Sequence, residues 1–240
     1  MQLVEYPCET PEELIALDEL LLLKAERGEV GETLRFWESR DLFVVVGRAC
    51  RVEEECFRIF CQEDNRKIIR RISGGGTVLQ GPGCYNYSVI LAYEKDAQYK
   101  NVSSSYQAIL AGVSDRLKKK GIRSEILPVS DLAVDGMKIS GNAQARKRSF
   151  FLHHGTFLVG FDVGKVARYL KHPPVEPKYR HGRMHDKFIG NIPVSPYEIR
   201  EIINEMFAPV GTWKPDARTV KEMRALVDSK YSIDKWNYAF

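Results

Sequence analysis

The most informative stretch of the sequence is Arg70-Arg71-Ile72-Ser73-Gly74-Gly75-Gly76-Thr77-Val78-Leu79-Gln80-Gly81-Pro82-Gly83-Cys84-Tyr85-Asn86-Tyr87-Ser88. Glycine lets a backbone approach a ligand closely and adopt positive φ without a Cβ penalty. Consecutive amide N–H groups suit a phosphate or a carboxylate, and the two arginines add fork-shaped donors for the same anion. The stretch therefore predicts an anion-binding loop, although a glycine cluster alone is as often an ordinary turn.

The residues on either side of the glycines predict strands. Lys67 to Arg71 leads into the loop as a strand, and Tyr85 to Leu91 continues as a strand after it. Leu42 to Val46 is continuously apolar, which is typical of a central strand that is buried on both faces. Gly47-Arg48 follows that strand directly.

The remaining elements do not alternate regularly between strand and helix. Thr10-Pro11-Glu12-Glu13 predicts the start of a helix, with Glu13 completing a capping box, and Asn101 to Gly121 has one apolar face at helical spacing. We also expect strands at Leu3–Tyr6, Leu34–Trp37 and Phe150–Val159, and helices at Glu53–Phe60, Asp162–Leu170, Ser195–Phe207 and Ala217–Ser229. This order predicts an α/β (α+β) fold with mixed, largely antiparallel sheets flanked by helices. Since no repeat or clear linker interrupts residues 1–240, we expect a single domain.

The segment from Asp131 to Ala143 predicts a hairpin, because Asp135-Gly136 is a strong two-residue turn signal. In that hairpin Val134 faces Met137, Ala133 faces Lys138, and Leu132 faces Ile139. The side-chain period of two gives an apolar face of Leu132, Val134, Met137 and Ile139 and an opposite face of Asp131, Ala133, Lys138 and Ser140. Lys138 is therefore expected on a rigid strand, pointing away from the core, although most exposed lysines serve only solubility.

Composition argues against several classes of protein. The chain has 36 Lys and Arg against 32 Asp and Glu, and a net charge of +4 is too small to indicate nucleic-acid binding. No apolar run approaches a membrane span, and the N-terminus lacks the pattern of a signal peptide. The five cysteines have no zinc spacing and predict structural thiols in the reducing cytoplasm. The polar segment from Lys171 to Gly190 contains three histidines, fits no zinc site and predicts a mobile loop.

A glycine loop with arginines and a strand-borne lysine can together hold two anionic groups. Joining a carboxylate to the α-phosphate of ATP requires this arrangement, because negative charge builds on the phosphorus oxygens in the transition state. The common phosphate-binding patterns GxGxxG and GxxxxGK[ST] are absent.

Several motifs in this order resemble those of the lipoate–protein ligases. Arg70-Arg71-x-Ser73-Gly74-Gly75-Gly76-x-Val78 is similar to the family signature, and Gly136-x-Lys138-Ile139-Ser140-Gly141-Asn142-Ala143 to the motif with the catalytic lysine. His153-His154-Gly155-Thr156-Phe157-Leu158 is similar to a third motif, and Val44–Arg48 and Lys230–Asn237 also match. The resemblance covers nearly the whole chain. It implies the fold shared with biotin protein ligases and class II aminoacyl-tRNA synthetases.

The resemblance also implies an activity. Lipoate would be activated by ATP, accompanied by Mg²⁺, to lipoyl-AMP and passed to a lysine of an apo lipoyl domain of a 2-oxoacid dehydrogenase E2 subunit or of the glycine-cleavage H protein. Lys138 would contact both the lipoyl carboxylate and the α-phosphate. The cofactor-binding residues would be Arg70, Arg71, Gly74, Gly75, Gly76, Thr77, Val78, Leu79, Asn142 and His154. Of these, Arg71 and the backbone from Gly76 to Leu79 would hold the nucleotide, and Gly74 and Gly75 would cover the lipoyl group.

The sequence departs from the family pattern just after the glycines. The family usually has His-Asp and then Gly-Asn, whereas this chain has Gln80-Gly81 and then Gly83-Cys84. The change removes a carboxylate and an amide from near the nucleotide. Many ligases also carry a small C-terminal accessory domain, which we expect to be absent here. Either a separate protein supplies it, or this protein carries out only part of the reaction.

Other functions are compatible with parts of the pattern. Octanoyl and lipoyl transferases share the fold and use a cysteine thioester instead of ATP, but this chain has no cysteine after Cys84, and neither Arg123–Ser130 nor Lys171–Gly190 contains one. A biotin ligase is disfavoured because its Gly-Arg-Gly-Arg type of loop is missing. A third alternative is a non-catalytic protein that binds lipoate or a lipoyl domain, which the changed residues favour and the retained Lys138 opposes.

Overall fold

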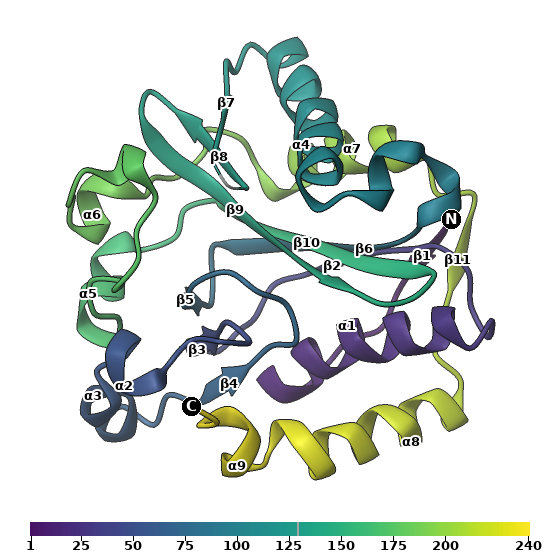
Figure 1. The fold of residues 1–240 in the computed structure, drawn as a ribbon, viewed down its shortest axis with the longest axis horizontal. Coiled ribbons are helices and arrows are strands. Elements are labelled where there is room, and N and C mark those ends of the chain that lie inside the picture. Colours follow the sequence, from purple (N-terminus) through teal and green to yellow (C-terminus); the bar gives the residue numbers. More distant parts are fainter. Residues whose placement is uncertain (129) are drawn as a thin grey trace.

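The computed structural model describes residues 1–128 and 130–240, which form two β-sheets and the helices around them (Figure 1). The larger sheet has eight strands in the order β11-β1-β2-β6-β10-β9-β8-β7. Its strands are β1 (Gln2–Val4), β2 (Thr33–Trp37), β6 (Cys84–Ala92), β7 (Glu125–Leu127), β8 (Asp131–Val134), β9 (Met137–Arg146), β10 (Phe150–Leu158) and β11 (Gly211–Trp213). The pairs β11–β1 and β1–β2 are parallel and all others are antiparallel. The predicted mixed, largely antiparallel sheet is confirmed.

A smaller sheet of three strands carries the glycine loop. Its central strand β3 (Phe43–Val46) is parallel to β4 (Ile68–Arg70) and antiparallel to β5 (Val78–Gln80). All of β3 is buried, as the continuous apolar run predicts. The glycine loop connects β4 to β5, so both of its ends are fixed by neighbours of β3.

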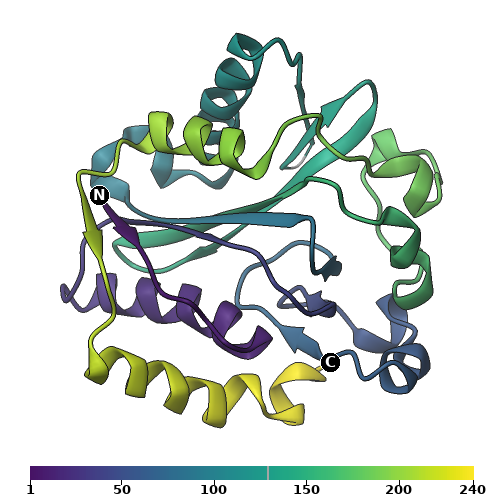
Figure 2. The same cartoon turned by 180° about the vertical axis from the view of Figure 1, so that it is seen from behind.

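Helices cover both faces of the large sheet (Figures 1 and 2). On one face, α4 (Val102–Lys119) and α7 (Pro196–Phe207) share a core with the sheet. On the other face lie α1 (Pro11–Glu26) and the small sheet, and α8 (Ala217–Leu226) packs outside α1. The caps of α1 and α7 differ. Ser195 and Glu198 form a full capping box, whereas the carboxylate of Glu13 accepts from the N–H of Glu9 instead of closing the predicted box at Thr10.

Short helices join these layers. They are α2 (Val52–Glu55), α3 (Arg58–Glu63), α5 (Val166–Tyr169), α6 (His185–Phe188) and α9 (Asp234–Asn237). The single helix predicted over Glu53–Phe60 is therefore two, and the one predicted over Asp162–Leu170 is a 3-10 turn followed by α5. The predicted last helix ends as a π-helical turn over Val227–Tyr231. The segment predicted as a loop, Lys171–Gly190, contains α6 and a 3-10 turn at Lys178–Arg180.

The predicted hairpin is present, but its register shifts between Leu132 and Ala133. Ala133 faces Lys138 as predicted, whereas Leu132 faces Ser140 instead of Ile139. Ile139 is thus an extra residue in β9, a β-bulge, and side-chain alternation reverses across it. The prediction that Lys138 and Ser140 share a face is therefore wrong, because the bulge keeps both Ile139 and Ser140 in the interior, each 2 % exposed.

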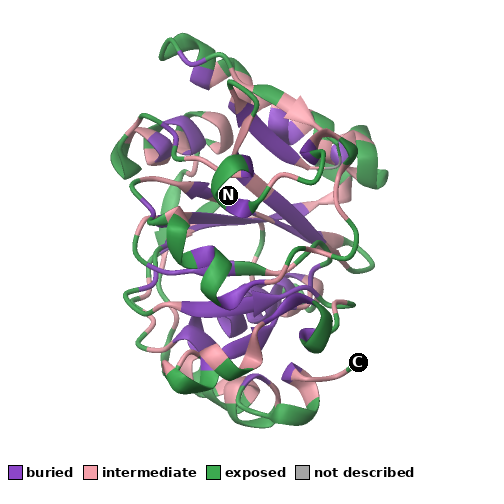
Figure 3. Cartoon of the chain, turned by 90° about the vertical axis from the view of Figure 1, so that its left-hand side faces the viewer, coloured by how far each residue is buried: buried purple, intermediate pink, exposed green. Residues whose placement is uncertain are grey.

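Burial follows the layers. Figure 3 shows the strands of both sheets buried and the outer surfaces of the helices exposed. Three apolar cores result, one between α1 and the sheets, one beneath α4 and α7, and one between the small sheet and α5. Within the described residues, no helix has the length and apolar character needed to cross a membrane.

Candidate active site

Arg71 organises the glycine loop from inside the protein. Its guanidinium donates to the carbonyl oxygens of Gly74 (2.6 Å), Gly76 (2.8 Å) and Val45 (3.3 Å), and its Nε donates to Ser73 Oγ (3.0 Å). Burial lowers the pKa of Arg71 to about 10, so the side chain remains protonated at neutral pH. The loop therefore carries its positive charge beneath its carbonyls instead of on its surface.

Because Arg71 draws these carbonyls inward, the amides that follow them point outward. The N–H and C=O of a trans peptide lie on opposite sides, so the N–H of Gly75 and that of Thr77 point away from Arg71. Among the described residues, the N–H of Gly75 has no acceptor, and that of Thr77 donates to a carboxylate oxygen of Glu55 at 3.0 Å. The outer rim of the loop thus already binds one anionic oxygen.

The loop is held in this shape by close contacts. A Cβ on Gly47, at the end of β3, would lie only 1.9 Å from the carbonyl oxygen of Gly75. Gly75 itself has a φ of +81°, which favours glycine. The thiol of Cys50 donates to the same carbonyl oxygen at 3.3 Å. Glycine is therefore required both within the loop and in the strand against which the loop packs.

His154, on β10, links the loop to the large sheet. Its Nε2 lies 2.6 Å from Ser73 Oγ, which also accepts a hydrogen bond from the Nε of Arg71. Burial and the Arg71 charge lower the pKa of His154 to about 3, so the ring is neutral at physiological pH. A chain of hydrogen bonds from Arg71 through Ser73 to His154 therefore joins the glycine loop to β10.

Lys138 lies next to the loop on the same face of the sheet. Its Nζ is 2.8 Å from Asp131 Oδ1, and its side chain is 26 % exposed. A Cβ on Gly141 would lie 2.8 Å from that Nζ, so a larger residue there would displace the end of the lysine side chain. Two residues further along β9, Ala143 Cβ lies 3.8 Å from where Gly75 would carry a Cβ. The glycine loop therefore packs against the same strand, β9, that carries Lys138.

Comparison with known proteins identifies the family of this chain. The model of the lipoyl protein ligase A/B catalytic domain matches residues 10–206. The chain belongs to this family. Its relatives include a probable lipoate-protein ligase A of Mycoplasma pneumoniae, 32% identical over 155 residues that are 65% of this chain and 44% of that protein. They also include the octanoyltransferase LipM of an Exiguobacterium strain, 30% identical over 176 residues, 64% of this chain and 63% of that protein.

The fold agrees with this assignment. A bi-partite lipoate protein ligase from Thermoplasma acidophilum superposes with a TM-score of 0.81 at 22% identity, covering 99% of this chain and 95% of that chain. This chain matches less than two thirds of the length of the two relatives named above. Those relatives are named as a ligase and as a transferase, so the family to which this chain belongs includes both kinds of protein.

Arg70 is placed differently from Arg71 in this family member. It is fully buried, and its guanidinium contacts the carbonyl oxygens of Gly47, Arg48, Cys50, Trp236 and Asn237. Its own N–H donates to Asn237 Oδ1, and its carbonyl accepts from Trp236 Nε1. The geometry thus favours a scaffold role in which Arg70 joins the loop region to α9, and it turns the side chain away from any ligand.

Asn142 and His154 face opposite sides of the sheet. Asn142 pairs in register with Gly155, next to His154, and its side chain accepts from the hydroxyl of Tyr87 and donates to Ser130 O. Gly155 is glycine because a Cβ there would lie 2.0 Å from Asn142 Oδ1. The structure therefore brings His154, but not the Asn142 side chain, to the face of the loop and Lys138.

The segment that departs from the family pattern has turned inward. The amide of Gln80 donates to Thr156 Oγ1 (2.9 Å) and to Asn86 Oδ1 (3.1 Å), which ties β5 to the large sheet. Cys84 is completely buried, and burial raises its pKa to about 12. This segment thus joins the two sheets and presents neither a carboxylate nor a thiolate to the loop.

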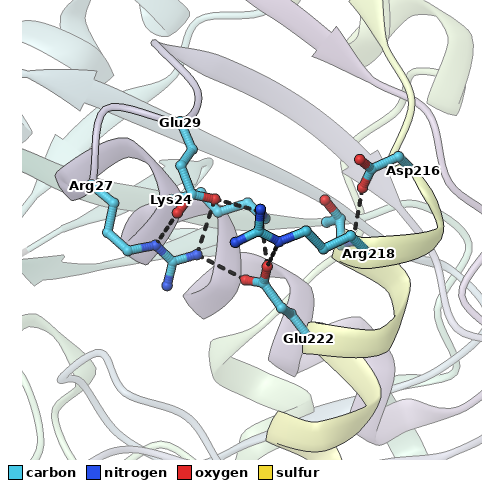
Figure 4. Close-up of polar contacts among 7 residues, drawn as sticks. Lys24, Arg27, Glu29, Asp216, Arg218 and Glu222 are labelled. Atoms are coloured by element: carbon cyan, nitrogen blue, oxygen red, sulfur yellow. Dashed lines mark hydrogen bonds and ion pairs between the residues drawn. The ribbon is translucent and has the colours of Figure 1, made fainter.

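Two surface hollows lie away from the site. One, of about 550 Å³, lies between α1 and α8, where Arg27 and Glu29 meet Glu222 and Arg218 in a network of ion pairs (Figure 4). The other, of about 230 Å³, lies near Pro82 and Phe161. Neither is lined by Lys138 or by a residue of the glycine loop. Within the described residues, no group of three or more His, Cys, Asp or Glu side chains could hold a metal ion.

Sequence reasoning missed three contributors to this site: Glu55, Asp131 as the partner of Lys138, and Gly47. Glu55 meets the loop across twenty-two residues of sequence, and no local pattern signals such a contact. The sequence pattern placed Asp131 on the same face of the hairpin as Lys138, but it did not indicate the ion pair between them. Gly47 directly follows a buried strand, which is a signal that could have found it.

Proposed function

We propose that this protein is an ATP-dependent lipoate–protein ligase. The observation that carries the proposal is the position of Lys138, a partly exposed ammonium beside a loop whose amides point outward. A lipoate carboxylate would attack the α-phosphorus of ATP, pyrophosphate would leave, and the resulting lipoyl-AMP would acylate the amine of an acceptor lysine with release of AMP. Charge builds on the α-phosphate oxygens during the first step, where preorganised donors are most effective.

The proposed roles are those that the resemblance to lipoate–protein ligases implies. Lys138 would bridge the lipoate carboxylate and the α-phosphate as a flexible point charge. The amides of Gly75 and Gly76 and of the following residues through Leu79 would face the nucleotide, with Thr77 released from Glu55 when phosphate takes its place. Gly74 and Gly75 would cover the lipoyl chain, and His154, neutral and hydrogen-bonded to Ser73, would support the loop from below.

Mg²⁺ would enter this site with ATP. Magnesium in nucleotide sites is typically held by one or two carboxylates together with phosphate oxygens and water. Glu55, beside the Thr77 amide, offers one carboxylate of that kind. The ion would neutralise phosphate charge, while the protein residues bind and orient the two substrates.

A thiol-dependent octanoyl or lipoyl transferase is the second candidate, because LipM enzymes are among the relatives. That mechanism needs a reactive thiolate. Burial raises the pKa of Cys84 to about 12 and that of Cys56 to about 12, and burial with the Glu55 contact raises that of Cys50 to about 11. The pKa values of Cys8 and Cys61 are raised as well, chiefly by burial. Because the pKa values of all five cysteines are raised, their thiols would be protonated at neutral pH, which supports the ligase over the transferase.

The proposed acceptors are apo lipoyl domains of 2-oxoacid dehydrogenase E2 subunits or the glycine-cleavage H protein. A bi-partite lipoate protein ligase shares this fold, so an accessory-domain protein is a further proposed partner. The proposed catalytic unit is the single domain of residues 1–240.

The experiment is acyl transfer to an apo lipoyl domain, followed by intact-protein mass spectrometry. One reaction contains lipoate, ATP and Mg²⁺ and the other contains octanoyl-carrier protein without ATP, and each is run with and without an accessory-domain protein. The proposal predicts modification only in the first, unchanged in Cys50→Ser and Cys84→Ser. Modification only in the second, lost in either serine variant, would establish the transferase instead. Lipoate binding without modification in any reaction would identify a non-catalytic binding protein.

A further inference from the structure

The carboxylate of Asp131 is held from two sides. Its Oδ1 pairs with Lys138 Nζ at 2.8 Å, and its Oδ2 accepts from the hydroxyl of Tyr179 at 2.6 Å. Asp131 is nearly buried, with 9 % of its side chain exposed. Both oxygens therefore have a fixed partner, and the direction in which Asp131 holds the lysine depends on Tyr179.

Tyr179 lies in the segment Lys171–Gly190, which the structure fastens to the Lys138 hairpin. Arg183 is the main connector, because its guanidinium donates to the carbonyl oxygens of Tyr179 (2.9 Å), Arg180 (3.0 Å) and Gly136 (2.9 Å). Gly136 is half of the hairpin turn. One cation thus fixes the backbone of Tyr179 relative to the strand that carries Lys138.

The same segment contacts Lys138 directly and supports the tyrosine ring. The N–H of Gly190 donates to the carbonyl oxygen of Lys138 at 2.9 Å. The ring of Tyr179 packs on Phe188, with 5.2 Å between ring centroids, and Phe188 is buried. Burial and the Asp131 charge raise the pKa of Tyr179, so its hydroxyl remains a donor across the physiological range.

We propose that Tyr179 is a positioning residue for Lys138, acting through Asp131. The tyrosine does not need to contact either substrate. It fixes the carboxylate, and the carboxylate aims the ammonium at the space beside the glycine loop. A lysine has a long, flexible stem, and a second fixed group is needed to hold its charge in one direction. This inference rests on the proposed function for its kinetic part and on geometry alone for its structural part.

The structural part is tested without substrates. In protein with ¹⁵N-labelled lysine side chains, the ammonium signal of Lys138 is assigned by its loss in Lys138→Arg. Tyr179→Phe should speed exchange of the Lys138 ammonium protons with water by about tenfold, the effect expected for loss of a hydrogen bond to a charged group. The matched control is Tyr169→Phe in the neighbouring helix α5. This substitution removes a hydrogen bond from a tyrosine hydroxyl to the carboxylate of Asp64. The control should leave the Lys138 signal unchanged.

The kinetic part uses the lipoate-dependent exchange of pyrophosphate into ATP. Tyr179→Phe should lower kcat by about tenfold and change KM for ATP by less than about twofold, because the hydroxyl contributes only to the geometry of the transition state. In an Asp131→Ala background the same substitution should cost less than about twofold, since residues that act through one another are not additive. Melting temperature is measured for every variant to exclude loss of fold.

The outcomes separate this inference from the proposed function. A folded Tyr179→Phe protein with unchanged ammonium exchange would overturn the positioning role, and so would losses that add fully to those of Asp131→Ala. If the wild-type protein shows no ATP-dependent activity, the proposed function fails, while the ammonium measurement still decides whether Tyr179 positions Lys138.

Discussion

The glycine loop and the Lys138 hairpin use their basic side chains in opposite ways. At the loop, both arginine side chains point into the protein. Arg70 is 0 % exposed and Arg71 is 6 % exposed, and their N–H groups donate to backbone carbonyls. At the hairpin, a single lysine is offered outward with 26 % of its side chain exposed. The comparison teaches that the arginines of the motif shape the backbone, whereas the ammonium group of Lys138, paired with Asp131, remains partly exposed.

The largest effect is expected for Lys138→Ala. Loss of the accessible cation should lower lipoylation of an apo lipoyl domain by about 10³-fold, comparable with removal of one preorganised transition-state donor. The matched control is Lys187→Ala in the adjacent segment, whose side chain is 75 % exposed and pairs with Asp186. Activity that survives in Lys138→Ala would contradict this contrast, because the arginines would then have to provide the positive charge for the substrates.

The next effect concerns the backbone of the loop. Gly47→Ala places a methyl group against the Gly75 carbonyl, so the loop must shift, at a cost of about 1–3 kcal/mol in stability. A displacement of this size should lower kcat/KM for ATP by about 10²-fold. Gly31→Ala is the control, since no atom lies within 4 Å of its added Cβ. Urea denaturation and steady-state kinetics measure both quantities, and normal kinetics in Gly47→Ala would contradict the fixed loop.

A smaller effect separates the two arginines. Arg71→Lys should raise KM for ATP by about tenfold, because a lysine cannot hold the carbonyls of Gly74 and Gly76 together in the same fork. Arg70→Lys should leave KM within about twofold and lower stability, since its partners belong to the scaffold. If Arg70→Lys instead impairs nucleotide binding as strongly as Arg71→Lys, the two arginines have the same role and the distinction is wrong.

The smallest effect on activity is expected at Gln80. Gln80→Ala should cost about 1–3 kcal/mol of stability, because it removes the buried hydrogen bonds of Gln80 with Asn86 and Thr156. Its kcat/KM per folded molecule should stay within about twofold of wild type, since the side chain faces the large sheet. A tenfold loss of activity at unchanged stability would place position 80 at the nucleotide.

Much of the fold was predictable because its signals are local. The capped helices, the buried strand β3 and the Asp135-Gly136 turn follow from nearest-neighbour chemistry, and the structure contains all of them. The bulge at Ile139 was not predictable, because it satisfies burial of Ile139 and Ser140 on one face, a demand of the surrounding core. The same holds for the split of Glu53–Phe60 into two helices.

In the candidate site, too, local features were predictable and long-range contacts were not. The motifs identify the loop and Lys138, but the direction of the arginines is set by partners far along the chain. Arg70 meets Trp236 and Asn237 across more than 160 residues, and Tyr179 meets Asp131 across 48 residues. Such contacts are decided by packing of the whole domain and leave no trace in local spacing.

The most direct test of the ligase assignment is exchange of labelled pyrophosphate into ATP by the purified chain. The reaction contains ATP, Mg²⁺ and labelled pyrophosphate, with and without lipoate, for wild type and for the double variant Cys50→Ser, Cys84→Ser. We expect pyrophosphate exchange that requires lipoate and is equal in both proteins. Absence of lipoate-dependent exchange, together with acyl transfer from an octanoyl thioester that the double variant cannot perform, would contradict it.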